Sequence, residues 1–300
     1  KVNEWGVFKE ATGEYLCGAR EKEVYAAVGL PWFPPEIREA RREFDWAAQG
    51  ELPDLVTEAD LQGDLHMHTT ATDGQATLVE MIAAAQSRGH RYIAITDHSQ
   101  RVSMANGLDE KRLLEQWSEI EDINESGAFE IQVLKGIECD ILEQGGMDLS
   151  DEVLSRADWV LGAIHYGQNQ PSRQITDRIL GAIENPYVDC IAHPTGRLIN
   201  KREAYEVMMD EVFGAAQQHG TLLELNANPA RLDLNDVLCA TAKMHGIPVV
   251  INTDAHSVKG LNVLKFGIQQ ARRGGLSAKE VANAGTFEQL QKMRSLRPRA

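Results

Sequence analysis

Short apolar runs alternate with amphipathic segments from residue 63 onward, and this alternation limits the fold more than any other feature of the sequence. The runs are rich in Ile, Val, Leu and Ala, as expected for strands that are buried on both faces of a parallel sheet. There are seven of them, at residues 64–68, 92–96, 132–139, 159–165, 188–193, 222–226 and 249–253. Seven strands that alternate with helices predict an α/β barrel of the TIM type, one unit short of the usual eight.

Capping signatures mark two of the helices that separate the strands. Thr77 and Glu80 form a capping box, and Gly89 is placed to end the same helix. Its apolar face follows the spacing i, i+3, i+4, i+7 at Leu78, Met81, Ile82 and Ala85. Thr286 and Gln289 repeat the capping signature, which predicts a last helix after them.

The N-terminal part of the chain has a different pattern and predicts a small appendage at residues 1–46. Residues 6–18 alternate like a hairpin with a Gly-containing turn, and residues 21–30 are typical of a short helix. Residues 47–61 are expected to be a linker, which leaves residues 62–300 for the barrel.

Composition and charge narrow the class of protein. No apolar run reaches the ~18 residues that a membrane helix needs, and residues 1–15 are polar and mixed, unlike a signal peptide. The formal net charge of −15 argues against the broad basic field that drives non-specific binding to nucleic acid. The chain begins with Lys1 rather than Met, so we expect it to be a piece of a longer protein.

The cysteines indicate a reducing compartment. Cys17, Cys139, Cys190 and Cys239 form no C-x-x-C pair, and three of them lie in or near apolar runs. This is typical of small buried side chains without disulfides, and we therefore expect a cytoplasmic location.

Six of the nine histidines occur where predicted strands end. They are His66, His68, His98, His165, His193 and His256, whereas His90, His219 and His245 precede strands. In a parallel barrel these two groups fall on opposite faces, and the strand C-termini form the active-site face. Packing alone does not explain six imidazoles at this end of the barrel, because each buried imidazole would need hydrogen-bond partners there. Neutral imidazole is, however, a common ligand of divalent metals.

Carboxylates are predicted at the same end of the barrel as these six histidines. An H-x-H motif (His66 and His68) ends the first strand and a D-x-H motif (Asp254 and His256) ends the last. Residues at i and i+2 of a strand point to the same face. Two further carboxylates are Asp73, in the loop after the first strand, and Glu138, at the end of the third strand. We therefore predict a metal site; Asp97, beside His98, is expected either to orient that ligand or to cap a loop.

Clustered metals suit the hydrolysis of a phosphate ester, because they activate water and clamp the attacking and leaving oxygens. Arg197 and Arg231 follow the fifth and sixth strands and are the predicted phosphate-binding groups; the alternative is that they hold loops together. With Glu138 and Asp254, they complete the predicted catalytic set.

The residues also carry a family resemblance. The strings GDLHMHT, AITDHS, KGIECDIL, AIHYG, IAHPTGRL, LELNANPARLDL and NTDAHS resemble the motifs of the PHP (polymerase and histidinol phosphatase) superfamily. The resemblance is strongest to the PHP domain at the C-terminus of bacterial and archaeal family X DNA polymerases, and residues 1–46 resemble the tail of the preceding thumb subdomain. It implies a distorted seven-stranded barrel with up to three divalent metals, Zn, Mn or Fe.

The resemblance also implies a ligand set. One ion would be held by His66, His68, Glu138 and Asp254. A second ion, bridged by Glu138, would be held by His165 and His193, and a third by Asp73, His98 and His256. All nine positions carry ligand-competent side chains. Departures from the family pattern at residues 163–164 and 166–176 leave the substrate open.

The activity implied by the resemblance is a metal-dependent 3′→5′ exonuclease, with or without 3′-phosphatase activity, that acts on DNA 3′ ends beside upstream polymerase domains. Against it, basic residues near the C-terminus (Arg272, Arg273 and 294–300) are few. The first alternative is a small-molecule phosphatase of the histidinol-phosphate type or a promiscuous phosphoesterase. The others are a metal-stabilised binding module and, last, a deacetylase- or amidohydrolase-like enzyme.

Overall fold

In the computed structural model, which describes residues 1–295, the chain divides into two units, Lys1–Asp54 and Leu55–Ala300. Residues 296–300, part of the basic C-terminal segment, lie outside the described residues. Within the described part, none of the helices has the length and apolarity required to span a bilayer.

The first unit contains a three-stranded antiparallel sheet in the order β1-β2-β3. The predicted hairpin is confirmed, since β2 pairs with β3. The elements of this unit are β1 (Val2–Asn3), β2 (Gly6–Phe8), β3 (Tyr15–Cys17), α1 (Glu21–Ala27), the 3-10 turn η1 (Pro35–Ile37) and α2 (Glu43–Gln49). Helix α2 therefore ends inside the segment expected to be a linker, and the later residues Leu55, Val56 and Leu61 are buried in the second unit.

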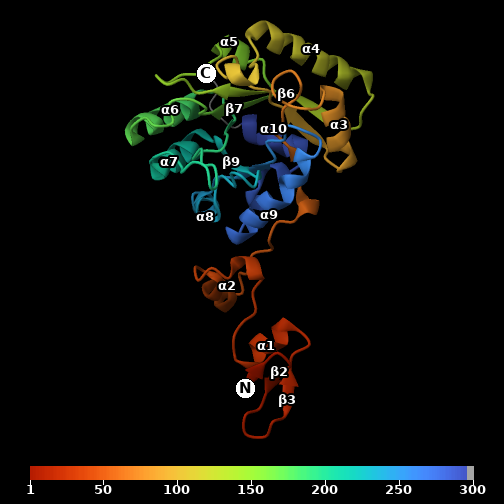
Figure 1. Cartoon of the computed structure of the whole chain (residues 1–300), viewed down its shortest axis with the longest axis vertical. Helices are drawn as coiled ribbons and strands as arrows, with labels where there is room; N and C mark the ends of the chain where they lie inside the picture. The colour runs from red at the N-terminus through yellow and green to blue at the C-terminus, as the bar shows by residue number, and fades with distance from the viewer. Residues whose placement is uncertain (296–300) are drawn as a thin grey trace. The chain divides into compact units, whose positions relative to one another are not determined.

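The second unit is built on a seven-stranded parallel sheet in the order β10-β9-β8-β7-β6-β5-β4 (Figure 1). Its strands are β4 (Gly63–Asp64), β5 (Tyr92–Ile95), β6 (Gln132–Asp140), β7 (Trp159–Ala163), β8 (Cys190–Ile191), β9 (Leu222–Asn226) and β10 (Val249–Asn252). Just past the two outer strands, Met67 bridges to Ala255, so the sheet curls into a nearly closed barrel. This confirms the predicted seven-stranded α/β barrel.

Helices alternate with the strands and cover the outside of the sheet (Figure 1). They are α3 (Leu78–Ser87), α4 (Glu110–Ser126), α5 (Asp151–Leu154), α6 (Ser172–Glu184), α7 (Met209–His219), α8 (Asp236–Met244), α9 (Leu264–Arg273) and α10 (Phe287–Ser295). The capping box of α3 is confirmed: Thr77 Oγ1 accepts from Glu80 N at 3.3 Å, and Glu80 accepts from Thr77 N at 2.8 Å.

Helix α10 closes one end of the barrel. Its Leu290 packs with Tyr92, Trp159 and Leu222, each of which is the first residue of its strand. The strand N-termini are thereby sealed by apolar side chains, and the other end of the barrel is left for polar groups.

Several strands are shorter than predicted. Near the site, backbone amides donate hydrogen bonds to side-chain oxygens instead of to the carbonyl groups of a neighbouring strand. After β4, the Leu65 amide donates to Asn252 Oδ1 at 2.9 Å, and the Met67 amide donates to Thr96 Oγ1 at 3.1 Å. His66 and His68 thus lie in an irregular extended segment rather than in a strand. His165 and His193 also follow the last residue of their strands.

Candidate metal centre

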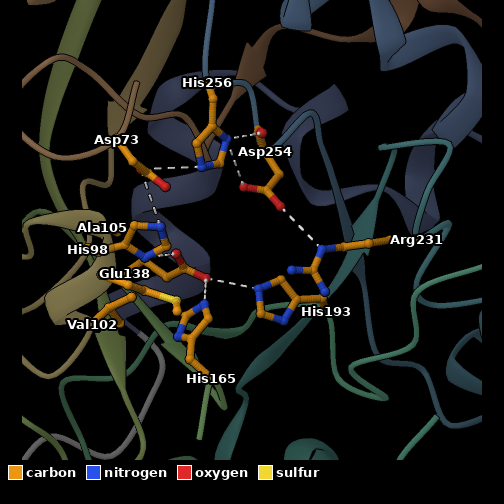
Figure 2. Close-up of a pocket in the computed structure, with 11 residues that line it drawn as sticks. Asp73, His98, Val102, Ala105, Glu138, His165, His193, Arg231, Asp254 and His256 are labelled. Carbon is orange, nitrogen blue, oxygen red and sulfur yellow. Dashed lines mark hydrogen bonds and ion pairs between the residues drawn. The ribbon is translucent and has the colours of Figure 1, made fainter. Parts of the chain in front are cut away.

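The nine predicted ligands gather at the C-terminal ends of the strands. Seven of them line a cavity of about 430 Å³, together with Arg231 and three apolar residues (Figure 2). His66 and His68 are fully buried and do not line the cavity, but both contact Glu138 and Asp254. The three histidines that precede strands in the sequence do not line it.

Glu138 is the centre of the cluster. Its carboxylate is buried, and its oxygens face five imidazoles. The nitrogen–oxygen distances are 2.8 Å to His98, 2.9 Å to His193, 3.4 Å to His165, 3.5 Å to His66 and 3.7 Å to His68. A carboxylate with two oxygens in this position is suited to bridge neighbouring cations.

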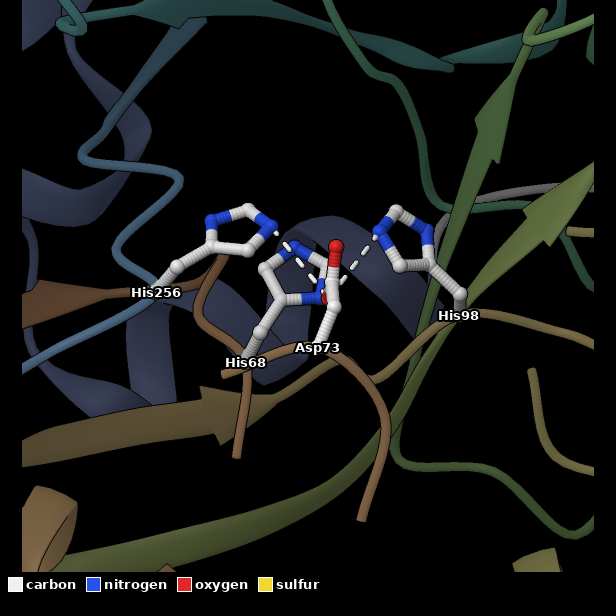
Figure 3. Close-up of side chains that lie close together, drawn as sticks. All are labelled: His68, Asp73, His98 and His256. Atoms are coloured by element: carbon white, nitrogen blue, oxygen red, sulfur yellow. Dashed lines mark ion pairs between the residues drawn. The ribbon is translucent and has the colours of Figure 1, made fainter. Parts of the chain in front are cut away.

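Asp73, at the edge of the cavity, is a second carboxylate that contacts more than one imidazole. Its Oδ1 lies between two imidazoles, 3.6 Å from His98 Nε2 and 3.4 Å from His256 Nε2 (Figure 3). The His68 ring stacks on His256 with centroids 4.1 Å apart. Ligand atoms of these four residues lie within 4.8 Å of one another, and His68 belongs equally to a group with His66 and Glu138. His68 is therefore shared by two groups of side chains that could each hold a metal ion.

Carboxylates that the sequence analysis missed hold the imidazoles in place. His66 Nδ1 lies 2.7 Å from Glu224 Oε1, and His165 Nδ1 lies 3.0 Å from Asp140 Oδ1. When each Nδ1–H donates to its carboxylate, the Nε2 lone pair of the same ring points toward Glu138. The signal in the sequence was a charged residue between apolar ones within a strand, as at Glu224, which has Leu223 and Leu225 on either side.

Glu224→Gln is expected to weaken metal binding about 10- to 100-fold. The neutral amide oxygen of glutamine accepts the Nδ1–H of His66 more weakly than the charged carboxylate of Glu224 does. Isothermal titration calorimetry with Mn²⁺ measures this change in affinity. Glu211→Gln, on the exposed first turn of α7, is the matched control and should bind as the unaltered protein does. Equal affinities for all three proteins would contradict the positioning role.

Asp97 caps a loop, the second of the two roles left open by the sequence. Its carboxylate accepts hydrogen bonds from the Thr69 amide at 2.8 Å, from Gln116 Nε2 at 2.6 Å and from the Thr72 hydroxyl. It holds the start of the loop that carries Asp73. No hydrogen bond between the side chains of Asp97 and His98 occurs among the described residues.

Imidazoles and carboxylates shift one another's pKa values. Burial, together with two nearby histidine rings, lowers the pKa of His68 to about 3. Burial also acts to lower the pKa of His98, but the carboxylates of Glu138 and Asp73 outweigh it and raise that pKa to about 10. Although burial acts to raise the pKa of Glu138, the surrounding histidines hold it well below its usual range. The carboxylates are therefore ionised, and cations compete with protons for this site.

The buried atoms of the cluster fit divalent cations. His66 Nε2, His68 Nδ1 and His193 Nδ1 are buried and make no hydrogen bond. A buried polar atom without a partner costs free energy, and a cation shared by imidazole and carboxylate ligands removes that cost for the atoms that reach it. Mixed nitrogen and oxygen ligands suit Zn, Mn and Fe.

Two of the predicted ligands have a backbone conformation that L residues rarely adopt. The φ angles of His193 and Asp254 are +29° and +54°. Left-handed conformations of non-glycine residues cost free energy and concentrate at functional sites. The turns that these residues make direct both side chains into the cluster (Figure 2).

The two predicted arginines have different positions. Arg231 lines the cavity, and its Nε lies 3.5 Å from Asp254 Oδ2. Arg197 does not line it: its Nε donates to the Arg231 carbonyl at 2.7 Å and its Nη2 to the Leu232 carbonyl. In this structure the Arg197 guanidinium therefore holds the loop that carries Arg231, which is the alternative role that the sequence left open for it.

Comparisons with known proteins agree with this geometry. The PHP domain profile matches residues 64–228, and the DNA polymerase beta thumb profile matches residues 1–39. The chain is 43% identical over 292 residues to a Bacillus subtilis protein named DNA polymerase/3′-5′ exonuclease PolX. That match covers 97% of this chain but 50% of the relative, so the chain spans half of its length.

More distant relatives match a smaller part of the chain. A probable phosphatase from Caldanaerobacter subterraneus is 29% identical over 205 residues, which cover 64% of this chain and 75% of the relative. The crystal structure of a histidinol phosphate phosphatase from Lactococcus lactis, complexed with zinc, L-histidinol and phosphate, has a TM-score of 0.53 at 16% identity. It covers 72% of this chain and 95% of that chain, and at this identity it supports the fold alone. With a family profile that spans more than half of its residues, this chain belongs to the PHP domain family.

Proposed function

We propose that this chain is a metal-dependent phosphoesterase whose substrate is the 3′ end of DNA, which it shortens as a 3′→5′ exonuclease, with 3′-phosphatase activity on ends that carry a phosphate. The observation that carries the proposal is the buried carboxylate of Glu138, which faces five imidazoles within 3.7 Å at the floor of an open cavity. A purely structural metal site needs four ligands and keeps no open position.

Up to three divalent ions, Zn, Mn or Fe, are held by the nine ligands. His66, His68, Glu138 and Asp254 hold one, Glu138 with His165 and His193 the second, and Asp73, His98 and His256 the third. Bound there, such ions supply an activated water and neutralise the charge of the phosphoryl group.

The chain's own residues position the substrate around this centre. Arg231 reaches into the cavity on the side across from His98 (Figure 2), where its guanidinium can donate to phosphoryl oxygens. Asn226 donates to Asp254 Oδ2 at 3.0 Å and holds that carboxylate in the orientation that faces His66 and His68. Both contacts place hydrogen-bond donors beside negative charge in the site.

Incubation of the Mn²⁺-loaded protein with 5′-labelled oligonucleotides is the test, with one strand ending in a 3′-hydroxyl and one in a 3′-phosphate. We expect stepwise shortening of the first strand and loss of phosphate from the second. Asp254→Asn should remove both activities, because it takes a negative charge from the cluster. Asp122→Asn makes the same chemical change on the exposed face of α4 and should leave both intact.

Loss of phosphate without any shortening would replace the exonuclease by the alternative, a small-molecule phosphatase or promiscuous phosphoesterase. One observation favours that alternative: among the described residues that line the cavity, Arg231 is the single arginine or lysine. One guanidinium is enough for one phosphate group, whereas a strand needs a longer basic track. Absence of both activities would overturn the proposal.

The thumb profile and the Bacillus subtilis relative support an assignment of the chain's parts and partners. Residues 1–46 are the tail of a polymerase thumb, residues 47–61 a linker and residues 62–300 the phosphoesterase barrel. The upstream polymerase domains are the partners that deliver the DNA 3′ end, and a cytoplasmic location follows from that role.

A further inference from the structure

The metal cavity has one apolar wall. Among the described residues that line it, the apolar ones are Val102, Met104 and Ala105, all from the loop between β5 and α4. Val102 and Ala105 lie across the cavity from Arg231 (Figure 2). They are 4% and 5% exposed, whereas Met104 is 86% exposed. The wall therefore has a packed base and a free thioether side chain at its edge.

The loop that presents Met104 is rigidly attached to the ligand strands. Its Ser99 amide donates to the Glu138 carbonyl at 3.0 Å, and its Leu108 amide donates to the His98 carbonyl at 2.8 Å. Gly107 closes the loop so tightly that a Cβ there would lie 2.0 Å from the Ser99 carbonyl oxygen. Met104 sits in the 3-10 turn η3 (Ser103–Ala105) between these attachments. Its position relative to Glu138 and His98 is thus determined by backbone hydrogen bonds.

A single exposed apolar side chain on a protein surface is ordinary. Met104 differs because it continues the wall of a cavity that is otherwise lined by the proposed metal ligands and an arginine. A ligand that spans this cavity needs a negatively charged group at one side and an apolar, flat group at the other. A nucleotide at a DNA end has both, since its phosphate is joined through the sugar to an aromatic base, and methionine sulfur makes favourable contacts with aromatic rings.

Resting on the proposed function, we propose that Met104, backed by Val102 and Ala105, contacts the base of the 3′-terminal nucleotide and makes the site prefer nucleotide ends that carry a base. The contact is apolar and reads no hydrogen-bonding edge, so it holds any of the four bases. Met104 is a specificity-determining residue and takes no part in the chemistry at phosphorus.

The test compares two oligonucleotides of the same length with the Mn²⁺-loaded protein. One ends in an ordinary nucleotide, and the other ends in a tetrahydrofuran analogue that keeps the 3′-hydroxyl and lacks the base. We expect the unaltered protein to remove the terminal nucleotide with a kcat/KM about three- to tenfold higher when the base is present. Met104→Ala should abolish this preference by slowing only the base-bearing substrate.

Met244→Ala is the matched control, because Met244 is 75% exposed at the end of α8 and does not line the cavity. It should keep the full preference. Equal rates on the two strands with the unaltered protein would overturn the inference and leave the exonuclease standing. Equal slowing of both strands by Met104→Ala would also overturn it, because the side chain would then act on the loop and not on the base. Shortening of neither strand would defeat the proposed function and the inference together.

Discussion

Glu138→Gln is expected to lower the rate of phosphate-ester hydrolysis at least about a hundredfold and to reduce the number of bound metal ions. Loss of a group that merely orients a ligand costs 10- to 100-fold, and Glu138 is placed to be a direct ligand. Glutamine keeps the size of the side chain but removes the charge that faces five imidazoles. Metal content by mass spectrometry and initial rates with a 3′-hydroxyl oligonucleotide measure the two effects.

Glu125→Gln is the matched control for this substitution, because Glu125 is exposed on α4. It should keep the metal content and the rate of the unaltered protein. Circular dichroism separates loss of the site from loss of the fold, since Gln is accommodated without a cavity. Full activity and full metal content in Glu138→Gln would refute the central role of this carboxylate.

Removal of metal is expected to destabilise the barrel by about 4 kcal/mol for each site that was loaded at about a thousandfold above its Kd. For a unit of this size the melting temperature should then fall by roughly 8–16 °C. The physical reason is that His66 Nε2, His68 Nδ1 and His193 Nδ1 are buried without hydrogen bonds, and the ionised carboxylates repel one another. Thermal unfolding by calorimetry with excess Mn²⁺, and again after dialysis against a chelator, measures the shift.

The Glu138→Gln variant provides the control for metal removal. It lacks the central ligand, so its melting temperature should respond less to the chelator than that of the unaltered protein. Two identical melting curves for the unaltered protein, with and without metal, would mean that the cluster binds no cation tightly.

The positions of the ligands were predictable because one rule places them. In a parallel barrel every strand C-terminus lies on the same face, so His98, His165 and His193 had to meet once the seven apolar runs were recognised as strands. The rule needs only the order of strands and helices along the chain. It does not need the exact ends of the strands, and those were predicted less well, as at Cys190–Ile191.

Arg197 illustrates the limit of that rule. The order of elements places Arg197 and Arg231 on the same face, and both side chains are long enough to reach a phosphate. Only the folded loops show that the Arg197 guanidinium is already used by two backbone carbonyls while Arg231 faces the cavity. A long flexible side chain takes its direction from neighbours that are distant in sequence.

By itself, the sequence determined the parallel barrel, the face on which the histidines and carboxylates gather and the set of candidate metal ligands, because these depend on the periodicity of apolar residues and on residue type at strand ends. The tertiary structure alone decided how the ligands are oriented and shared. Glu224 and Asp140, on other strands, orient the imidazole rings of His66 and His165. Glu138 is the centre of the cluster because five imidazoles from four segments converge on it. Orientation is a property of contacts between segments far apart in the chain, and no local pattern encodes it.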